Sequence, residues 1–397
     1  MIAHLTLAYV FIYICLGLIG IGIILLFQMK LAHNRELRNI DRYEKKHRDY
    51  FVYIQSHLEE DAVLQLPLGK LTKLERRMIQ LKYIEWIEAF KGDHRRKLIQ
   101  LCHDSGFVQE DLKLLRRASY GKRVEVAYRL GGMRAGEAVP ELLHLMQRRK
   151  YNPLMIVIAR AIAKSSQQPK DVLHMLRSLL SHNKPIHALA ADIVTESSLD
   201  SGILYPMLLE DADPGIVQVG MAVTRGRTVP EVMPALKRLT GTKKQSLREE
   251  AVQLYLGTYP ALHQDAAIRL MKDSSWEVRA ATVRSLGMLG VEDSIDLLTE
   301  ALRDSSSKVR YLSAESLSAI GESGFEALCR VARNGKGLQR DAALERIEIV
   351  LAQETEHSAL EHMVAYNKKR LLHTRYFGNK STQRIVGKKA LGGDYTA

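Results

Sequence analysis

An apolar pattern recurs along the chain at a nearly constant spacing. Residues 273–290 read DSSWEVRAATVRSLGMLG, and residues 304–321 read DSSSKVRYLSAESLSAIG, an offset of 31. In both segments an Asp is followed five residues later by Val and six later by Arg, and then by apolar residues at helical spacing. Each segment ends in Gly, which suits the left-handed residue that often terminates a helix. The pattern predicts a repeated helix.

The same register extends through most of the chain. Continued in both directions from Arg279 and Arg310, it gives eight equivalent positions: Arg123, Met155, His187, Gln218, Arg248, Arg279, Arg310 and Arg340. Four residues after each stands a small or aliphatic residue: Ala127, Ala159, Ala191, Ala222, Val252, Val283, Ala314 and Leu344. Seven residues after each stand Leu130, Ile162, Val194, Arg225, Tyr255, Leu286, Leu317 and Ile347. Because positions four and seven share a helix face, we predict stacked helices facing one core.

This arrangement resembles the HEAT-repeat family through D-x4-V-R-x6-L followed by Gly, over roughly residues 93–352. The resemblance implies an all-α solenoid of about eight helix pairs. It also implies a structural ladder of Asp and Arg side chains between neighbouring units. The matching residues are Asp273, Arg279, Asp304, Arg310 and, in a less regular unit, Arg248. The domain boundaries expected for the solenoid are 92–365.

The N-terminal segment has a different pattern. Residues 5–27 are 23 residues without a charge, which as a helix would be about 35 Å long, enough to cross about 30 Å of hydrocarbon. No basic segment precedes this run and no small-residue cleavage site follows it, so a signal peptide fits poorly. A buried core helix is the remaining alternative. We expect a single transmembrane helix at 5–28, with residues 1–4 outside the cytoplasm.

Basic residues follow this apolar run. They are Lys30, Arg35, Arg38, Arg42, Lys45, Lys46 and Arg48. Since positive charge accumulates on the cytoplasmic side, the bulk of the chain is expected in the cytoplasm at the cell membrane. Two interpretations stay open for these residues: a topology signal alone, or contact with anionic lipid headgroups.

Two further regions flank the repeats. Residues 29–91 are expected to be a basic juxtamembrane helix and capping helices, because Thr72-Lys73-Leu74-Glu75 has the form of a capping box and Leu37, Ile40, Tyr43, Phe51, Ile54 and Leu58 are mostly at helical spacing. At the other end, a helix is expected around 358–372 and a basic, flexible tail over 366–397. The tail holds Lys368, Lys369, Arg370, Arg375, Lys380, Arg384, Lys388 and Lys389 against Asp394 alone. A solvated end and a contact with an acidic partner or lipid are both open.

Composition adds little sign of catalysis. The chain is 46% apolar and 26% charged, with only three Cys at unrelated spacings and a net charge of +13. It has no HExxH, no His-Glu dipeptide, no phosphate loop and no GxSxG motif. His357 and His362 are five residues apart, off-face for joint ligation on a helix. We therefore expect no enzyme activity, no cofactor and no metal site.

The expected function is protein binding, because a solenoid exposes a long groove. Trp276 and Tyr311 are the candidate partner contacts, although a Trp in this position more often packs on its neighbour. The arrangement resembles bacterial membrane-anchored HEAT proteins that serve envelope or polysaccharide machinery, which implies a membrane glycosyltransferase as one partner. The alternatives are a HEAT-like lyase or glycosylase, and a binder of anionic lipid or nucleic acid. The bilayer anchor makes nucleic acid the less favoured of these ligands.

Overall fold

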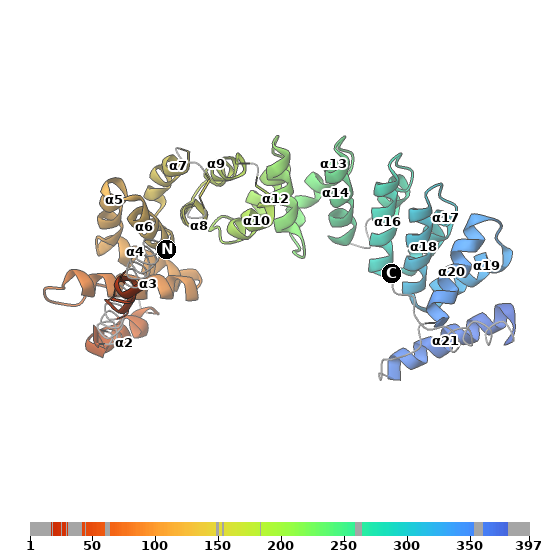
Figure 1. The fold of residues 1–397 in the computed structure, drawn as a ribbon, viewed down its shortest axis with the longest axis horizontal. Helices are drawn as coiled ribbons and strands as arrows, with labels where there is room; N and C mark the ends of the chain where they lie inside the picture. Colours follow the sequence, from red (N-terminus) through yellow and green to blue (C-terminus); the bar gives the residue numbers. More distant parts are fainter. Residues whose placement is uncertain are drawn as a thin grey trace, which may run out of the picture. The chain divides into compact units, whose positions relative to one another are not determined.

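The computed structural model describes residues 17, 19–24, 26–28, 30, 42–43, 45–59, 64–147, 151–152, 155–182, 184–258, 264–352 and 360–379. Throughout these residues the secondary structure is helical, without strands (Figure 1). The chain forms two compact units. The first comprises residues up to 179 with 196–198, and the second comprises 180–195 and the residues from 199 onward.

The first unit contains the helices that precede and begin the repeats. These are α2 (Arg48–His57), α3 (Lys73–Ala89), α4 (Gly92–Asp104), α5 (Phe107–Arg117), α6 (Tyr120–Gly132), a 3-10 turn (Gly136–Ala138), α7 (Val139–Gln147), α8 (Met155–Ser165) and most of α9 (Pro169–Leu180). Within the unit, α6 packs against both α5 and α8. Helices from successive pairs therefore lie side by side.

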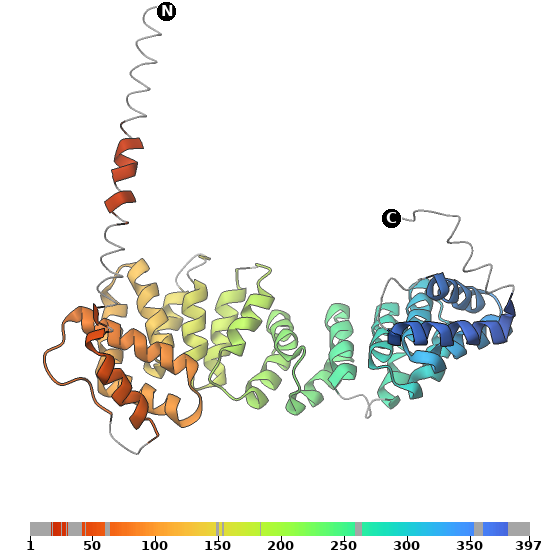
Figure 2. The same ribbon diagram turned by 90° about the horizontal axis from the view of Figure 1, so that it is seen from below.

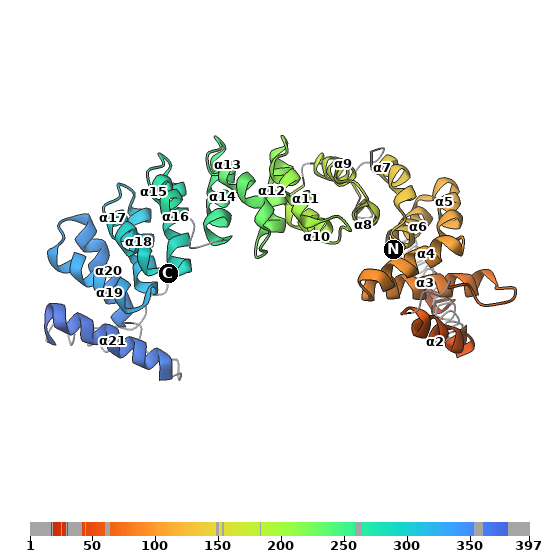
Figure 3. The ribbon, with the colours of Figure 1, turned by 180° about the vertical axis from the view of Figure 1, so that it is seen from behind.

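The second unit continues the same pattern. Its helices are α10 (His187–Thr195), α11 (Ser201–Leu209), α12 (Pro214–Thr224), α13 (Met233–Leu239), α14 (Gln245–Thr258), α15 (Gln264–Leu270), α16 (Trp276–Leu289), α17 (Ile295–Ala301), α18 (Ser307–Ala319), α19 (Gly321–Asn334), α20 (Leu338–Ala352) and α21 (Leu360–Phe377). Short 3-10 turns at Pro230–Val232 and Glu292–Ser294 precede α13 and α17. The even-numbered helices from α10 to α20 each pack against the next (Figures 1 and 3).

All eight register positions fall on even-numbered helices, from Arg123 on α6 to Arg340 on α20. The predicted apolar face is turned inward. Among the eight residues that stand four positions after each register position, six are buried, while Ala222 and Leu344 are half-buried. Among the eight residues that stand seven positions after each register position, seven are buried. Among the described residues, the prediction of stacked helices with a shared apolar face is confirmed within each of the two units.

Arg225, the polar exception, lies just after the end of α12. Its backbone ends the helix, and its exposed side chain forms an ion pair with Glu250, Nη2 to Oε1 at 2.6 Å. Because α12 ends at Thr224, the position is outside the helix face that the other members share. The apolar face is interrupted here by an early helix end.

Helix α16 approaches α18 closely at Gly287. A Cβ added there would lie 2.9 Å from the Cα and 2.5 Å from the Cβ of Ser316. The Ser316 hydroxyl donates to the backbone oxygen of Val283 at 3.1 Å, which holds the two helices together at this point. A side chain larger than hydrogen at 287 would therefore separate the helices.

The N-terminal region packs as a cap on the first unit. Thr72 and Glu75 form the predicted capping box: the Thr72 hydroxyl accepts from the Glu75 N–H at 3.2 Å, and the Thr72 N–H donates to Glu75 Oε2 at 2.8 Å. Phe51, Ile54 and Leu58, three members of the expected apolar face, are buried. The cap is therefore an extension of the same apolar core.

A buried ion pair lies behind this cap. The side chain of Arg129 on α6 is 2% exposed and donates to both carboxylate oxygens of Asp111, at 2.9 and 2.6 Å. Gln80 on α3 also donates to Asp111, at 2.7 Å. Three helices are thus joined by one carboxylate that is itself almost fully buried.

Helix α21 differs from the expectation for the C-terminal region. It extends to Phe377, so residues 366–377 are helical rather than part of an unordered tail. Figure 2 shows α21, in dark blue, running across the last helix pair. His373 is buried, and Lys369 Nζ donates to the Ser318 backbone oxygen at 2.9 Å. Packing on α19 stabilises this basic segment as a helix. The remaining tail residues, 380–397, lie outside the described residues.

The expected transmembrane segment, 5–28, also lies mostly outside the described residues. Among the residues that the structure does describe, no helix has the length and apolar character needed to cross a bilayer.

Candidate interaction surface

The Arg and Asp residues of the repeat lie at the junctions between helix pairs. Arg279 on α16 donates to both carboxylate oxygens of Asp304 in the next unit, at 2.7 and 2.8 Å. The same guanidinium donates to the backbone oxygen of Asp273 at 2.7 Å. Arg279 therefore joins its own turn to the turn before α18.

Asp304 carries a second structural role in that turn. Its Oδ1 accepts from the backbone N–H of Ser306 at 2.8 Å, just before α18 begins. Burial opposes ionisation, but the hydrogen bonds from Arg279 and from the Ser306 N–H hold the pKa of Asp304 below its usual value. The bond with Asp304 in turn raises the pKa of Arg279. Both side chains are therefore charged together in the folded protein.

The preceding junction has an ion pair of the same kind, with a longer distance between the charged atoms. Arg248 Nη2 lies 3.4 Å from Asp273 Oδ1, and Arg248 Nη1 donates to the Thr242 backbone oxygen at 3.0 Å. Asp273 Oδ1 accepts from the Ser275 N–H at 2.8 Å. The pairs Arg248–Asp273 and Arg279–Asp304 are thus two successive junctions of the same kind.

Arg310 occupies the next position but has no carboxylate partner among the described residues. It donates to the backbone oxygens of Asp304 and Ser305, at 2.8 and 3.0 Å. The residue that stands one repeat after Asp304 is Gly335, which has no side chain to complete the pair. The series of ion pairs ends at this unit, and the Arg310 guanidinium keeps unused donors.

Arg310 lines a cavity of about 210 Å³ between α18 and α20. Two exposed apolar side chains border it: Tyr311 is 46% exposed and Leu338 is 63% exposed. Charged groups of both signs complete the lining, with Asp341 and Glu345 beside Arg310 and Arg346. We call the group of Arg310, Tyr311 and Leu338 the α18–α20 surface.

Trp276 stands at the first position of α16 and is 39% exposed. The corresponding position on α18 is Ser307, which lines the α18–α20 cavity. Trp276 itself does not line that cavity. Leu338, by contrast, was not singled out from the sequence, because a single Leu after a Gly-containing turn has no distinguishing pattern.

The basic residues predicted to contact lipid or an acidic partner are placed differently from one another. Lys30, Arg42, Lys45, Lys46 and Arg48 are described and exposed. Lys46 Nζ lies 2.6 Å from Glu75 Oε1. Arg35, Arg38, Lys388 and Lys389 lie outside the described residues.

Within α21 the basic residues divide by face. Lys368 forms an ion pair with Glu322 at 2.6 Å, and Lys369 lies half-buried 5.8 Å from the centre of the Phe325 ring, where burial lowers its pKa. Arg370 is exposed, next to Leu371 at 69% exposed. Only part of the predicted basic set therefore faces solvent.

The described residues contain no group of three or more His, Cys, Asp or Glu side chains placed to hold a metal ion. Cys102 and Cys329 are free and buried, and burial raises the pKa of each thiol to about 12. Neither thiol is therefore activated as a nucleophile.

The repeat geometry agrees with a comparison of protein families, in which a model of HEAT repeats matches residues 264–348. This part of the chain is similar to HEAT repeats. It covers α15 to most of α20, including the junction between Arg279 and Asp304 and the α18–α20 surface. HEAT repeats are typical of protein-interaction scaffolds.

Three solved structures show likeness over much of the chain. An engineered protein is 15% identical, with 81% of this chain and 96% of that chain covered and a TM-score of 0.31. The Pds5–Scc1 complex, described in relation to cohesin function, is 13% identical, with 83% and 70% covered and a TM-score of 0.28. Human deoxyhypusine hydroxylase in complex with glycerol is 17% identical, with 69% and 98% covered and a TM-score of 0.20. No curated protein has a sequence that matches this chain.

Proposed function

We propose that this protein is a scaffold that holds another protein at a membrane, and that the α18–α20 surface contacts this partner. One observation carries the proposal: Arg310 keeps unused donors beside two exposed apolar side chains, Tyr311 and Leu338, around one cavity. Arg and aromatic side chains provide much of the binding energy in protein interfaces. Asp341, Glu345 and Arg346 surround them as a polar rim.

The size and charge of the cavity indicate the kind of partner. About 210 Å³ accommodates one or two side chains rather than a whole substrate molecule. The lining holds two acidic and two basic residues. The partner that fits is a protein segment with an apolar side chain flanked by polar groups of both signs. Among the described residues, no group of three or more metal-ligating side chains stands there.

The membrane tether in this proposal rests on the sequence. The 23 uncharged residues 5–27 are long enough to span a bilayer, and the basic residues from Lys30 to Arg48 favour the cytoplasmic side for the repeats. A partner at that membrane follows, with an envelope or polysaccharide complex that contains a glycosyltransferase as the specific candidate.

Crosslinking in native membranes tests both parts of the proposal. The full chain with Tyr311→Ala and Leu338→Ser is compared with the wild type and with a matched control, Tyr128→Ala, which removes another exposed aromatic on α6. We expect one protein to be captured by the wild type and the control and lost with the double variant. Equal capture by all three forms would exclude the α18–α20 surface. Recovery of the full chain in the soluble fraction would exclude the tether.

A second candidate function is binding of anionic lipid by α21. Its solvent face combines the apolar Met363, Val364 and Leu371 with the exposed cations Arg370 and Arg375, the composition of helices that lie at a lipid interface. Because the N-terminal tether alone would hold the full chain in a nanodisc, co-sedimentation does not report lipid binding by α21. The test is therefore a comparison of phosphatidylserine and phosphatidylcholine nanodiscs, in which protection of α21 from hydrogen exchange rises only with the anionic lipid. Equal protection in both would exclude lipid binding by α21.

A further inference from the structure

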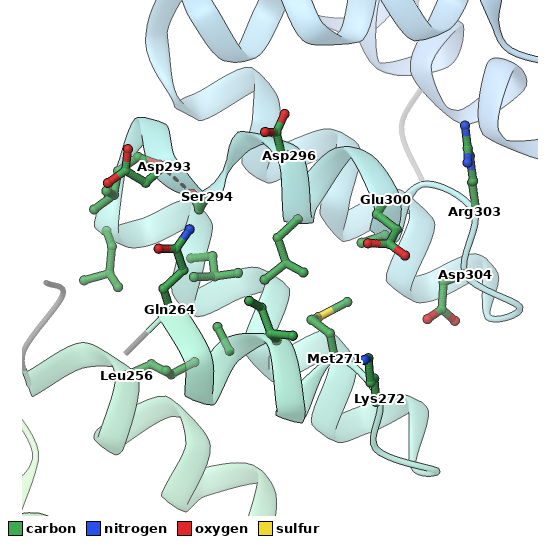
Figure 4. A pocket seen from close by; sticks show the side chains of 17 residues that line it. Leu256, Gln264, Met271, Lys272, Asp293, Ser294, Asp296, Glu300, Arg303 and Asp304 are labelled. Carbon is green, nitrogen blue, oxygen red and sulfur yellow. Dashed lines mark hydrogen bonds between the residues drawn. The ribbon is translucent and has the colours of Figure 1, made fainter. Parts of the chain in front are cut away.

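A groove larger than the α18–α20 cavity lies between α15 and α17. Its volume is about 670 Å³ (Figure 4). Both α15 and α17 are only seven residues long and both pack on α16. The apolar floor includes Ile268, which is 40% exposed, with Met271 and Leu297 half-buried. An apolar floor of this size is available for a ligand.

One wall of this groove is acidic. Asp293, Asp296 and Glu300 stand along the α17 side in Figure 4, all three exposed. None of the three side chains has an ion-pair partner among the described residues. The spacings of three and four residues place Asp296 and Glu300 on one helix face. The wall therefore presents a row of unpaired negative charge above an apolar floor.

The basic groups near the groove offset this row only in part. Arg303 donates to Gln339 Oε1 at 2.7 Å, and Asp304, which also lines the groove, is paired with Arg279. Lys272 stands on the α15 side, opposite the acidic wall. With Asp304 paired to Arg279, the three carboxylates of the wall outnumber the two cations Lys272 and Arg303, which leaves the groove net negative in a chain whose net charge is +13.

The chain itself contains a segment with the complementary chemistry. Residues 380–391, which lie outside the described residues, include four cations and no acid, and three large aliphatic residues: Lys380, Arg384, Ile385, Val386, Lys388, Lys389 and Leu391. Cations would meet the acidic wall while the aliphatic side chains cover the floor. We propose that the α15–α17 groove binds residues 380–391 of the same chain.

The position of α21 allows this contact. Tyr376, near the end of α21, donates to Glu326 Oε1 on α19 at 2.9 Å. Three residues before Glu326, Ser323 donates to Glu292 Oε1 at 2.7 Å, and Glu292 is next to Asp293 of the acidic wall. The last turn of α21 is therefore about one turn of α19 away from the edge of the groove. Twelve residues extend up to about 40 Å, enough to follow the whole wall.

Disulfide trapping in the full chain tests the proposal. Ile268→Cys on the groove floor is combined with Ile385→Cys, and Cys15→Ser removes the native thiol that could interfere. The matched control pair is Ile203→Cys with Ile385→Cys, because Ile203 is an exposed aliphatic residue on α11 of the same unit. We expect an intramolecular disulfide to form at least about tenfold faster in the groove pair, because docking raises the effective concentration of the tail.

Charge neutralisation gives the second measurement. Asp293→Asn, Asp296→Asn and Glu300→Gln are added to the groove pair, and Asp192→Asn, Glu231→Gln and Glu348→Gln serve as a control with the same change in net charge. The groove substitutions should lower the trapping rate about tenfold, as high salt should, because three ion pairs are lost. The control substitutions should not.

Each of three results would overturn the proposal. Equal trapping rates in the groove pair and the Ile203 pair would show that the tail only collides at random. Trapping that is insensitive to the three groove substitutions and to salt would remove the charge complementarity. A disulfide that joins two chains and disappears on dilution would assign the groove to a second copy rather than to the same chain.

Discussion

Arg279 forms a bidentate ion pair with Asp304, and both side chains are nearly covered, at 12% and 10% exposed. This contact crosses from one helix pair to the next, so it resists separation of neighbouring units rather than unfolding of one helix. Charged hydrogen bonds with this geometry are stronger than neutral ones.

Asp304→Asn should lower the free energy of unfolding by about 1–2 kcal/mol, because the amide keeps one acceptor but loses the charge. Urea unfolding at neutral pH measures the change. Asp341→Asn is the control, since Asp341 is exposed and has no ion pair among the described residues. The difference between Asp304→Asn and wild type should shrink in acid, because the lowered pKa of Asp304 adds stability only where the carboxylate is ionised. Similar effects of both variants would contradict a structural role for the pair.

The capping box at Thr72 and Glu75 predicts a specific loss of stability in acid. Hydrogen bonds from Lys46 and from Thr72 lower the pKa of Glu75 from 4.5 to about 2. A depressed carboxyl pKa adds stability that is complete above about pH 4.5 and is lost as the pH falls toward 2.

Glu75→Gln should therefore flatten the dependence of the urea midpoint on pH between 2 and 5. Glu85→Gln, on the same helix but exposed in its pair with Lys82, should leave this dependence as in the wild type. A Glu75→Gln protein that loses stability in acid to the same extent as the wild type would show that other groups control the transition.

Gly287 and Gly257 form a matched pair of helical glycines with opposite surroundings. An alanine at 287 would overlap the Cα and side chain of Ser316, whereas nothing lies within 4 Å of a Cβ at 257. Gly287→Ala should destabilise by about 1–3 kcal/mol through overpacking. Gly257→Ala should stabilise by about 0.5–1 kcal/mol through helix propensity. Thermal unfolding of the two variants distinguishes these effects, and a shift of the same sign in both would contradict the close approach of α16 and α18.

Removing one member of the buried pair of Arg129 and Asp111 should be costly. Arg129→Leu leaves an almost fully buried carboxylate with only Gln80 and Arg77 nearby, and we expect a loss of about 3–5 kcal/mol. Adding Asp111→Leu should restore much of this loss, because no buried charge then remains without its partner. Glu125→Gln, which alters only the exposed carboxylate on Arg129, should change stability little. A double variant as unstable as Arg129→Leu would show that shape, rather than charge, governs this site.

Several contacts escaped prediction because they join residues far apart in sequence. Gln80, Asp111 and Arg129 come from three helices, and nothing in their local patterns shows that they meet. Leu338 gains importance only because α20 places it beside Tyr311. The acidic row at Asp293, Asp296 and Glu300 has a visible helical spacing, but a row of this kind is usually a solvated face. Its apolar neighbours from α15 become visible only when α15 and α17 are placed on α16.

The amino-acid sequence by itself determined the helical class, the register of the repeat and the inward face, because helix formation and amphipathic spacing depend on residues within one or two turns. Tertiary structure decided where the series of ion pairs ends, how α21 packs on α19, and which short helices leave a groove between them. These features depend on the distances between backbones of different helices, and packing of the whole unit sets those distances.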